Sequence, residues 1–374
     1  MKSEPQNYFT DTMNAPSLTD MTVEDLLAKL VSFPSLSTRE AELVNWLEDQ
    51  LKETGLVEVE RVDDNLLIHA GSGKPWLLLN SHSDVVPPSP DHQGEPFDPV
   101  IRDGRMYGRG TTDAKASSAG MIKAMLNYAA NPSASQGRVT FAMTVCEEAY
   151  GDQNGMARLR KFWGDQKPDA AIVGEPTLLA PCIAQKGLVV LRLITRGQSG
   201  HAARVYGENA IYKMGIALNQ LSSINYNNEN PYLGPVKITP TTITGGSANN
   251  ANPEYCEVEV DIRTIPDIPV SQLIHDLNKT VDAEVVIKSD RLISTGTDPD
   301  SAIAKAAYSA TGKDFFGSPT CSDWVFLSDV PTVKLGPGDS NDSHTKNESI
   351  DLQQAKEAEN VYGTIIRNYF SELS

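Results

Sequence analysis

The sequence has few cysteines and no long apolar run. Its four cysteines (Cys146, Cys182, Cys256 and Cys321) are far apart and form no Cys-x-x-Cys pair, which argues against a disulfide framework and an all-cysteine zinc site. No apolar segment approaches the roughly 20 residues that a membrane-spanning helix needs. The first residues, MKSEPQNYFTDTMNAPS, lack the apolar core of a signal peptide, so we expect a loose arm. Together these features favour a cytoplasmic protein.

Basic residues are in the minority. The chain has 32 Lys and Arg against 49 Asp and Glu, a formal net charge of −17 at pH 7. This balance argues against nucleic acid and against an anionic membrane as partners. The length of 374 residues favours two domains, and a hydrophobic content of 40% is enough for a substantial core.

Short apolar runs alternate with helical patterns in the first half of the chain. WLLLN (76–80), RVTFAMTV (138–145) and AAIVG (170–174) are typical of strands buried on both faces, and residues 114–131 are Ala-rich as in a helix. This βαβ pattern predicts an α/β fold with a central mixed, mostly parallel sheet. Ser37-Thr38-Arg39-Glu40 has the form of a capping box for the helix that follows, which Gly55 would close.

The pattern changes from about Ile183. Strand and helix patterns follow in the order β-α-β-β-α-β, ending with AEVVIKS, and this order is typical of a small α+β layer. The helix and strand pattern of the first half resumes from about Ser301. We therefore predict one domain made of residues 1–182 and 290–374, interrupted by an inserted domain of residues 183–289.

Acidic or histidine clusters follow the predicted strands at five places. Functional groups collect at the carboxyl ends of strands in open α/β sheets. The clusters are His82 with Asp84, Asp113 in GRGTTDAKAS, the pair Glu147-Glu148, Glu175 in VGEPT, and His344 in GPGDSNDSHTKNE.

Two histidines and three carboxylates can hold two divalent ions, with one carboxylate between them. Histidine nitrogens favour zinc-like metals over magnesium. Such a pair of ions lowers the pKa of a water molecule and polarises a carbonyl, but a base must still take the proton of the water. Of two adjacent glutamates, one can bind metal while its neighbour is that base.

Each cluster alone has a simpler explanation. Glu147-Glu148 could be a solvated pair, Asp113 a helix cap, Glu175 a turn residue before proline, and His344 a plain loop residue. Five such clusters, each at a predicted strand end, are hard to explain as caps and turns.

The chain resembles the dinuclear-zinc deacylase and carboxypeptidase family, which includes acetylornithine deacetylase and acetyl-lysine deacetylase. The resemblance runs from about Leu26 to the C-terminus, through HSDVVP, GRGTTDAK, EEAYG, GEPT, SGHAAR, DIR and GPGDSNDSHTKNE in that order. It implies a zinc-peptidase-like catalytic domain, an inserted dimerisation domain, a homodimer, and two divalent ions, zinc or cobalt. One departure is Cys146, where many relatives have Asp; we expect a buried, inert thiol there.

The resemblance also implies a role for each polar residue of the clusters. Glu147 would be the general base and later the acid toward the leaving amine, and Asp84 would hold His82 from behind. The metal ligands would be His82 and Glu175 for one ion, Glu148 and His344 for the other, and Asp113 as the bridge between them.

Four residues of the inserted domain match family positions that serve the substrate. His201 would reach into the partner's site and donate to the oxyanion, although without the resemblance a plain loop histidine is the simpler explanation. Arg263 and Asn250 would bind the substrate α-carboxylate and line the cleft, because the Arg fork can engage both oxygens. Arg204 is a second candidate for that carboxylate.

The substrate implied is an N-acyl amino acid, most simply N-acetylornithine in arginine biosynthesis. GPGDS and HAAR-x-x-G-x-N-A-I-Y are similar to the acetylornithine and acetyl-lysine branch, and Asp323 or Glu348 could attract the ornithine side chain. N-acetylcitrulline, N-succinylornithine and N-acetyl-lysine stay open. So do a dipeptidase or aminoacylase of the same family and, last, a non-catalytic metal-binding relative.

Overall fold

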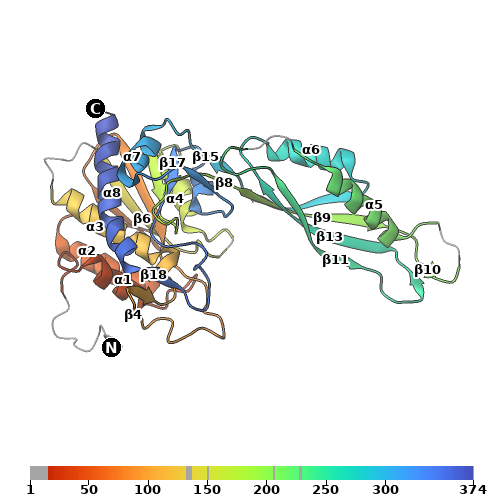
Figure 1. Cartoon of the computed structure of the whole chain (residues 1–374), viewed down its shortest axis with the longest axis horizontal. Coiled ribbons are helices and arrows are strands. Elements are labelled where there is room, and N and C mark those ends of the chain that lie inside the picture. The colour runs from red at the N-terminus through yellow and green to blue at the C-terminus, as the bar shows by residue number, and fades with distance from the viewer. Residues whose placement is uncertain (1–15, 132–136, 150, 205–206, 227–229, 374) are drawn as a thin grey trace. The chain divides into compact units, whose positions relative to one another are not determined.

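The computed structural model describes residues 16–131, 137–149, 151–204, 207–226 and 230–373 (Figure 1). The predicted N-terminal arm lies almost wholly outside these residues. The chain divides into two compact units. The first unit comprises Met1–Ile183, Thr297–Phe316 and Ser322–Ser374, and the second comprises Ala184–Gly296 and Gly317–Cys321. The main segment of the second unit therefore lies between crossings after residues 183 and 296, where the sequence pattern placed them after 182 and 289, and the chain crosses twice more, after residues 316 and 321.

A mixed sheet forms the centre of the first unit. Its strands, in spatial order, are β1 (Glu58–Val62), β2 (Asn65–Ala70), β6 (Arg138–Thr144), β3 (Trp76–His82), β7 (Ala170–Val173), β17 (Thr332–Lys334) and β8 (Cys182–Gln185), and the short β15 (Thr295–Gly296) pairs with β8. The strands β6, β3, β7 and β17 are parallel, whereas β1, β2 and β8 join the sheet in antiparallel pairs. The predicted α/β fold with a mixed sheet is confirmed.

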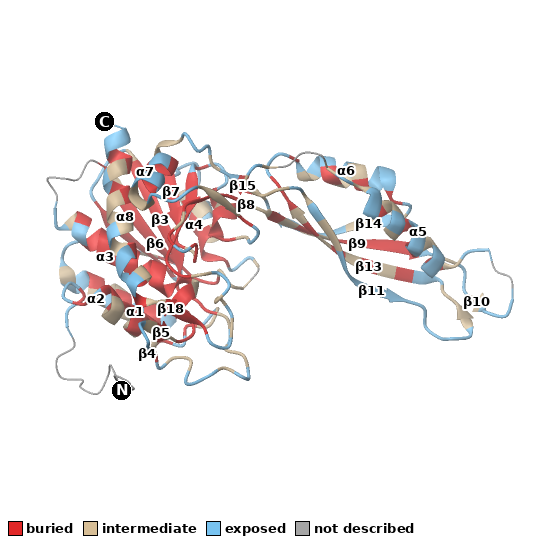
Figure 2. Ribbon diagram, in the orientation of Figure 1, coloured by how far each residue is buried: buried red, intermediate tan, exposed pale blue. Residues whose placement is uncertain are grey.

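Both faces of the central strands are covered, which explains their continuous apolar sequence. Every residue of β3 is buried (Figure 2). Leu78 of β3 belongs to the same buried apolar cluster as Met156 and Leu159 of α4 (Gly155–Trp163), and successive side chains of a strand point to opposite faces. The helices of this unit are α1 (Val23–Val31), α2 (Ala41–Thr54), α3 (Ala116–Ala129), α4 (Gly155–Trp163), α7 (Ala302–Thr311) and α8 (Leu352–Glu372).

Smaller elements complete the first unit. A π-type turn, Thr111–Lys115, precedes α3, and a 3-10 helix spans Asp323–Leu327. The short strands β4 (Val100–Arg102), β5 (Arg105–Tyr107) and β18 (Ser349–Asp351) form a separate small sheet, and β16 (Phe316–Ser318) pairs with β8.

The start of α2 differs from the prediction. The helix begins at Ala41, and its N-cap residue Glu40 makes no side-chain capping bond. The capping box expected at Ser37 and Glu40 is therefore wrong, because both side chains bond to distant parts of the chain instead. The predicted closure at Gly55 is confirmed, since this residue has the left-handed φ of 63° that favours glycine.

The second unit is an antiparallel sheet packed against two helices. Its strand order is β11-β13-β9-β14, and its buried residues alternate along β9 and β13, where they meet α5 and α6. The elements are β9 (Gly187–Arg196), β10 (Gly200–His201), α5 (Ala210–Ser223), β11 (Lys237–Gly245), β12 (Ala251–Asn252), β13 (Tyr255–Thr264), α6 (Val270–Thr280), β14 (Glu284–Leu292) and β15 (Thr295–Gly296). The β-α-β-β-α-β order of the sequence pattern is present, with the short strands added.

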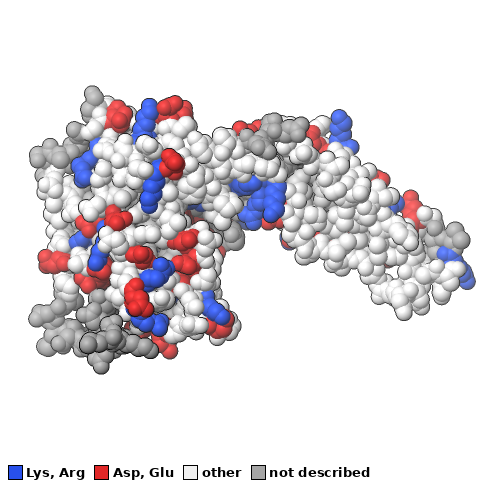
Figure 3. Space-filling model, in the orientation of Figure 1, with Lys and Arg blue, Asp and Glu red and all other residues white. Residues whose placement is uncertain are grey.

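Among the residues that the structure describes, no helix is both long and apolar enough to cross a membrane. On the face of the first unit that Figure 3 shows, acidic and basic side chains are intermingled.

Gly155, the first residue of α4, gives a direct test of this packing. A Cβ atom there would lie 2.1 Å from Asn65 Oδ1 and 2.7 Å from the Val145 nitrogen. We expect Gly155→Ala to lower the free energy of unfolding by about 1–3 kcal/mol, measured by denaturant titration. The matched control is Gly215→Ala within α5, where a Cβ meets nothing within 4 Å, and a small gain of up to about 1 kcal/mol is expected. Equal effects of the two changes would contradict this description of the packing.

Candidate metal centre

Three neighbouring parallel strands deliver acidic and histidine side chains to one edge of the sheet. His82 is the last residue of β3, Glu147 and Glu148 follow the end of β6, and Glu175 follows the end of β7. Because β6, β3 and β7 run parallel, their carboxyl ends lie side by side. Residues far apart in the sequence thus meet at this edge.

The side chains form two groups that share Asp113. One group is His82, Asp113 and Glu175, and the other is Asp113, Glu148 and His344, with the possible ligand atoms of each group within 4.8 Å of one another.

The two oxygens of Asp113 face different histidines. Asp113 Oδ1 lies 3.2 Å from His82 Nε2, and Asp113 Oδ2 lies 3.4 Å from His344 Nε2. His82 Nε2 also lies 3.9 Å from Glu175 Oε1, and His344 Nε2 lies 2.8 Å from Glu148 Oε1. A carboxylate with its two oxygens turned to two sites has the geometry of a bridge.

The donor atoms and their charges fit divalent cations. Imidazole nitrogens with carboxylate oxygens are the ligand set of zinc and similar metals. In the metal-free arrangement the carboxylates repel one another. Burial, and then the charge of Asp113, raise the pKa of Glu175 to about 8. A cation between these groups removes that repulsion, because it stabilises the ionised form.

Burial likewise raises the pKa of Glu147 well above its usual value, and the charges of Glu175, Asp323 and Glu148 raise it further, while His82 opposes them. Glu147 is half-buried and belongs to neither ligand group. Its position beside the two groups suits a residue that exchanges protons rather than one that binds metal.

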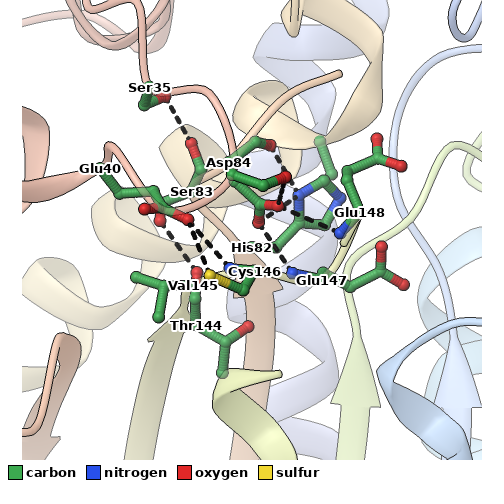
Figure 4. Close-up of polar contacts among 12 residues, drawn as sticks. Ser35, Glu40, His82, Ser83, Asp84, Thr144, Val145, Cys146, Glu147 and Glu148 are labelled. Atoms are coloured by element: carbon green, nitrogen blue, oxygen red, sulfur yellow. Dashed lines mark hydrogen bonds and ion pairs between the residues drawn. The ribbon is translucent and has the colours of Figure 1, made fainter. Parts of the chain in front are cut away.

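Asp84 makes two kinds of contact behind the site (Figure 4). The ring nitrogen His82 Nδ1 lies 2.9 Å from the main-chain oxygen of Asp84 and 3.6 Å from its Oδ1. The carboxylate accepts the N–H groups of Glu147 and Glu148, both at 3.0 Å, and the hydroxyl of Ser37 at 2.7 Å. The main-chain carbonyl is thus the closer partner of His82, and the carboxylate holds the backbone of the two glutamates.

Glu348 hydrogen-bonds to the backbone of the loop that carries Asp113. Its Oε1 accepts the N–H groups of Thr112 at 3.0 Å and Asp113 at 3.1 Å, and its Oε2 pairs with Arg109. Arg109 also donates to the main-chain oxygen of Thr345 at 3.3 Å. This ion pair therefore joins the Asp113 loop to the segment after His344. Sequence reasoning missed Arg109, whose local signal was only its place between two glycines.

Neither acid suggested for the ornithine side chain is available to a substrate. Glu348 is 1% exposed and is engaged as described above. Asp323 is 2% exposed and accepts hydrogen bonds from Asn154 at 2.8 Å, Thr144 at 2.8 Å and Asn80 at 3.4 Å. The prediction was wrong for both residues, because each carboxylate is enclosed and saturated by its neighbours.

Cys146 directly precedes Glu147, and its nitrogen and sulfur both contact Glu40. It is buried, and burial together with the charge of Glu40 raises the pKa of its thiol to about 11. A thiol that stays protonated is a poor nucleophile and a poor metal ligand. The expectation of a buried thiol is confirmed, and its inertness stays a prediction that the raised pKa supports.

The predicted substrate residues lie in the second unit. His201 in β10 is opposite Ala251 of β12, and its Nδ1 accepts the N–H of Ala203 at 3.1 Å. The main-chain oxygen of Asn250 accepts the N–H of Ala202 at 2.9 Å, and that of His201 accepts the N–H of Arg204 at 2.9 Å. The structure therefore gathers His201, Arg204 and Asn250 around one short strand pair, and all three are exposed.

Arg263 lies elsewhere in the second unit, on β13. Its Nε and Nη2 donate to the two oxygens of Asp261 at 2.9 and 3.1 Å. In this arrangement a carboxylate of the chain itself occupies one side of the guanidinium fork.

A family model and several known proteins match most of this chain. A family model described as peptidase family M20/M25/M40 matches residues 78–368. A succinyl-diaminopimelate desuccinylase of Wolbachia pipientis subsp. Culex pipiens is 29% identical over 371 residues, covering 92% of this chain and 93% of that protein. An acetylornithine deacetylase of Proteus mirabilis is 28% identical over 378 residues, covering 92% of this chain and 96% of that protein.

The fold is also similar to a solved structure. The YXEP protein of Bacillus subtilis, described as a dinuclear metal binding peptidase, superimposes with a TM-score of 0.72 and 15% identity. The match covers 92% of this chain and 96% of that one. At this identity the likeness concerns the fold.

The raised pKa of Glu175 predicts how the metal-free protein responds to pH. Between about pH 4.5, the ordinary value, and pH 8, the folded chain keeps a proton that the unfolded chain has released. Stability of the metal-free protein therefore falls as pH rises through this window, by at most about 1.4 kcal/mol per pH unit from this group. We expect the Tm of chelator-treated protein to be lower at pH 8 than at pH 6.

Two comparisons make this test specific. Glu175→Gln cannot ionise at this position, so the Tm of the metal-free variant should depend less on pH. Metal-loaded parent protein should also show a smaller fall, because cations stabilise the ionised carboxylate. A metal-free Tm that rises from pH 6 to pH 8 contradicts the assignment.

Proposed function

Because this chain belongs to peptidase family M20/M25/M40 and is a metal-dependent hydrolase of that family, we propose that it removes the acyl group from an N-acyl amino acid. The acyl group is acetyl and the most suitable substrate is N-acetylornithine. The predicted family resemblance is itself confirmed. The observation that carries the proposal is the pair of His-carboxylate groups sharing Asp113, with Glu147 beside them.

We propose the following ligands for two divalent ions, zinc or cobalt. His82 and Glu175 would hold one ion, Glu148 and His344 would hold the other, and Asp113 would serve both, which the distances above support. When bound, the ions supply Lewis-acid polarisation of the amide carbonyl and a lowered pKa for the attacking water.

Glu147 carries the proton in this proposal. Its carboxylate takes a proton from the water whose oxygen adds to the amide carbon. It then gives that proton to the amide nitrogen as the C–N bond breaks, leaving a carboxylic acid and a free amine, and the acid then ionises as the amine takes up its proton. In the metal-free chain, burial is the main cause that raises the pKa of Glu147, and a general base works best with its pKa raised toward the operating pH.

The second unit supplies substrate contacts and the dimer interface in this proposal. Ile211, Tyr212 and Ile216 are exposed on α5, Tyr212 to 78%, and Figure 3 shows a largely uncharged face on this unit. An apolar exposed helix face is suited to self-association. His201 of one protomer would donate to the oxyanion in the partner's site.

Arg263, Asn250 and Arg204 are proposed to meet the α-carboxylate of the substrate. Arg263 uses Nε and Nη2 for Asp261, so Nη1 is the nitrogen it can turn toward a substrate carboxylate. Asp261 would then fix the plane of the guanidinium group rather than compete with the substrate.

The alternative substrates differ from N-acetylornithine in the acyl group or in the amino acid. The two relatives above are described as removing succinyl and acetyl groups, so N-succinylornithine stays beside N-acetylornithine. N-acetylcitrulline, N-acetyl-lysine and a dipeptidase or aminoacylase activity are also retained. Arginine biosynthesis and a cytoplasmic location stay predictions of the sequence.

Release of amine from a substrate panel tests this function. The panel comprises N-acetylornithine, N-acetylcitrulline, N-acetyl-lysine, N-succinylornithine, succinyl-diaminopimelate and several dipeptides, each with zinc- or cobalt-loaded protein. We expect the highest kcat/KM for N-acetylornithine, loss of activity with a chelator, and recovery on adding metal. Dominant cleavage of dipeptides, or hydrolysis by the metal-free protein, contradicts the proposal.

Glu147→Gln is the matched variant for the base. Gln is similar in size and keeps a carbonyl oxygen but cannot carry the proton. We expect metal content to be unchanged and kcat to fall by about 10²–10⁴-fold, the usual contribution of a general base. Parental activity in a metal-loaded Glu147→Gln protein would exclude this role.

Subunit mixing tests the role of His201 across a dimer. His201→Ala and Glu147→Gln should each be nearly inactive alone. A mixed dimer has one site with both native residues, so an equal mixture after subunit exchange should regain about a quarter of the parental activity. Dimer mass is measured in parallel by light scattering. Failure to regain activity in a verified mixed dimer rules out sharing of His201 between subunits.

A further inference from the structure

The segment that carries the two glutamates is held by side chains rather than by a neighbouring strand. After β6 ends at Thr144, four successive main-chain N–H groups each donate to a side-chain oxygen. The acceptors are Asn65 Oδ1 for Val145 at 3.2 Å, Glu40 Oε1 for Cys146 at 3.0 Å, and the two oxygens of Asp84 for Glu147 and Glu148 at 3.0 Å each. These acceptors come from three separate parts of the sequence.

The backbone at Cys146 needs such support. Its φ of 56° lies in the left-handed region, which costs a residue with a Cβ roughly 1 kcal/mol relative to ordinary conformations. A relaxed Cys146 would turn the next peptide and with it the direction of the Glu147 side chain. The bond of the Cys146 N–H holds the left-handed residue itself, and the bonds of Val145 and Glu147 hold its two neighbours.

Glu40 provides the acceptor for that N–H (Figure 4). It is 4% exposed and stands at the N-cap of α2, yet its side chain makes no bond to the helix. An acidic side chain at that position would ordinarily interact with the helix N-terminus. Instead its Oε1 approaches both the nitrogen of Cys146 at 3.0 Å and the sulfur at 3.5 Å. Burial of a carboxylate is unfavourable, so this use of Glu40 calls for a role at the site.

We propose that Glu40 is a positioning residue that holds the left-handed turn at Cys146 and thereby directs the carboxylate of Glu147. The inference rests on the proposed role of Glu147 as the base. Glu40 touches neither the ligand groups nor the substrate. Its effect reaches the reaction through the backbone of Cys146 and Glu147.

The proposal separates Glu147 from Glu148. Without the Glu40 acceptor, Asp84 still holds the N–H groups of Glu147 and Glu148, whereas Cys146 loses the bond that fixes its left-handed φ. The relaxed turn adjoins Glu147 and lies one residue further from Glu148, so metal binding should be kept while the base loses its direction. A misplaced catalytic group of this kind lowers kcat by about 10–100-fold. KM should change little, because no substrate contact is removed.

The experiment compares matched variants as metal-loaded proteins. Glu40→Met has nearly the same size without the acceptor, whereas Glu40→Gln keeps an oxygen that can accept the N–H of Cys146. Cys146→Ala removes the thiol and leaves the main-chain bond. Measurements are kcat and KM, metal content, Tm, and amide hydrogen exchange of the peptide containing residues 144–149. Glu40→Ala provides a second deletion if the Met variant does not fold.

The proposal predicts a loss of kcat by about 10–100-fold in Glu40→Met with KM and metal content retained. It predicts recovery to within about threefold of the parent in Glu40→Gln and near-parental kcat in Cys146→Ala. Exchange at residues 144–149 should be about tenfold faster in Glu40→Met alone. A lower Tm with unchanged kcat in Glu40→Met would show a merely structural role and overturn the proposal. So would failure of Glu40→Gln to recover activity.

Amide hydrogen exchange distinguishes failure of the proposed hydrolase function from failure of the positioning role of Glu40. If the parent protein hydrolyses no N-acyl amino acid, the proposed function fails, and the exchange rates alone then decide the role of Glu40. Faster exchange in Glu40→Met but not in Glu40→Gln supports the positioning role. Equal rates overturn it.

Discussion

Repulsion between carboxylates is the constraint on which the rest of this structure depends. Asp113, Glu147, Glu148 and Glu175 converge on one edge of the sheet, where two unit charges 4 Å apart repel by about 4 kcal/mol near a protein surface. Cations can relieve this repulsion, but the loops must hold the carboxylates in place before any cation arrives. The structure achieves this with hydrogen bonds to the loop backbone, which do not use up the oxygens of the site.

Buried charged residues outside the site help to hold the loops in place. Glu348, paired with Arg109, holds the Asp113 loop, and Lys115 donates to the main-chain oxygens of Leu30 at 2.9 Å and Phe33 at 3.0 Å. Glu348 and Arg109 pair with each other, and Lys115 binds main-chain oxygens, as buried charges require. The residues proposed as metal ligands are thus supported by surrounding charged residues with a structural function.

The sequence predicted the parts of the site that depend on local order. A candidate ligand at the end of a buried strand leaves a pattern within a few residues, as at His82 and Glu175. The residues that hydrogen-bond to the loop backbone leave no such pattern, because their bonds join distant segments of the chain. Ser37 and Glu40 match a capping box in sequence, yet they bond to Asp84 and Cys146. Asp323 and Glu348 look like candidate charges for a substrate, since nothing in their neighbours reveals that they are buried.

The place of β17 in the sheet has a consequence during synthesis of the chain. β17 (Thr332–Lys334) pairs with β7 (Ala170–Val173), although the whole second unit lies between them in sequence. A ribosome therefore completes β3, β6 and β7 long before the strand that covers the edge of β7 exists. Until then the nascent sheet presents an open, apolar edge, of the kind that pairs with other chains. Premature release of the polypeptide after the second unit would leave a product prone to aggregate.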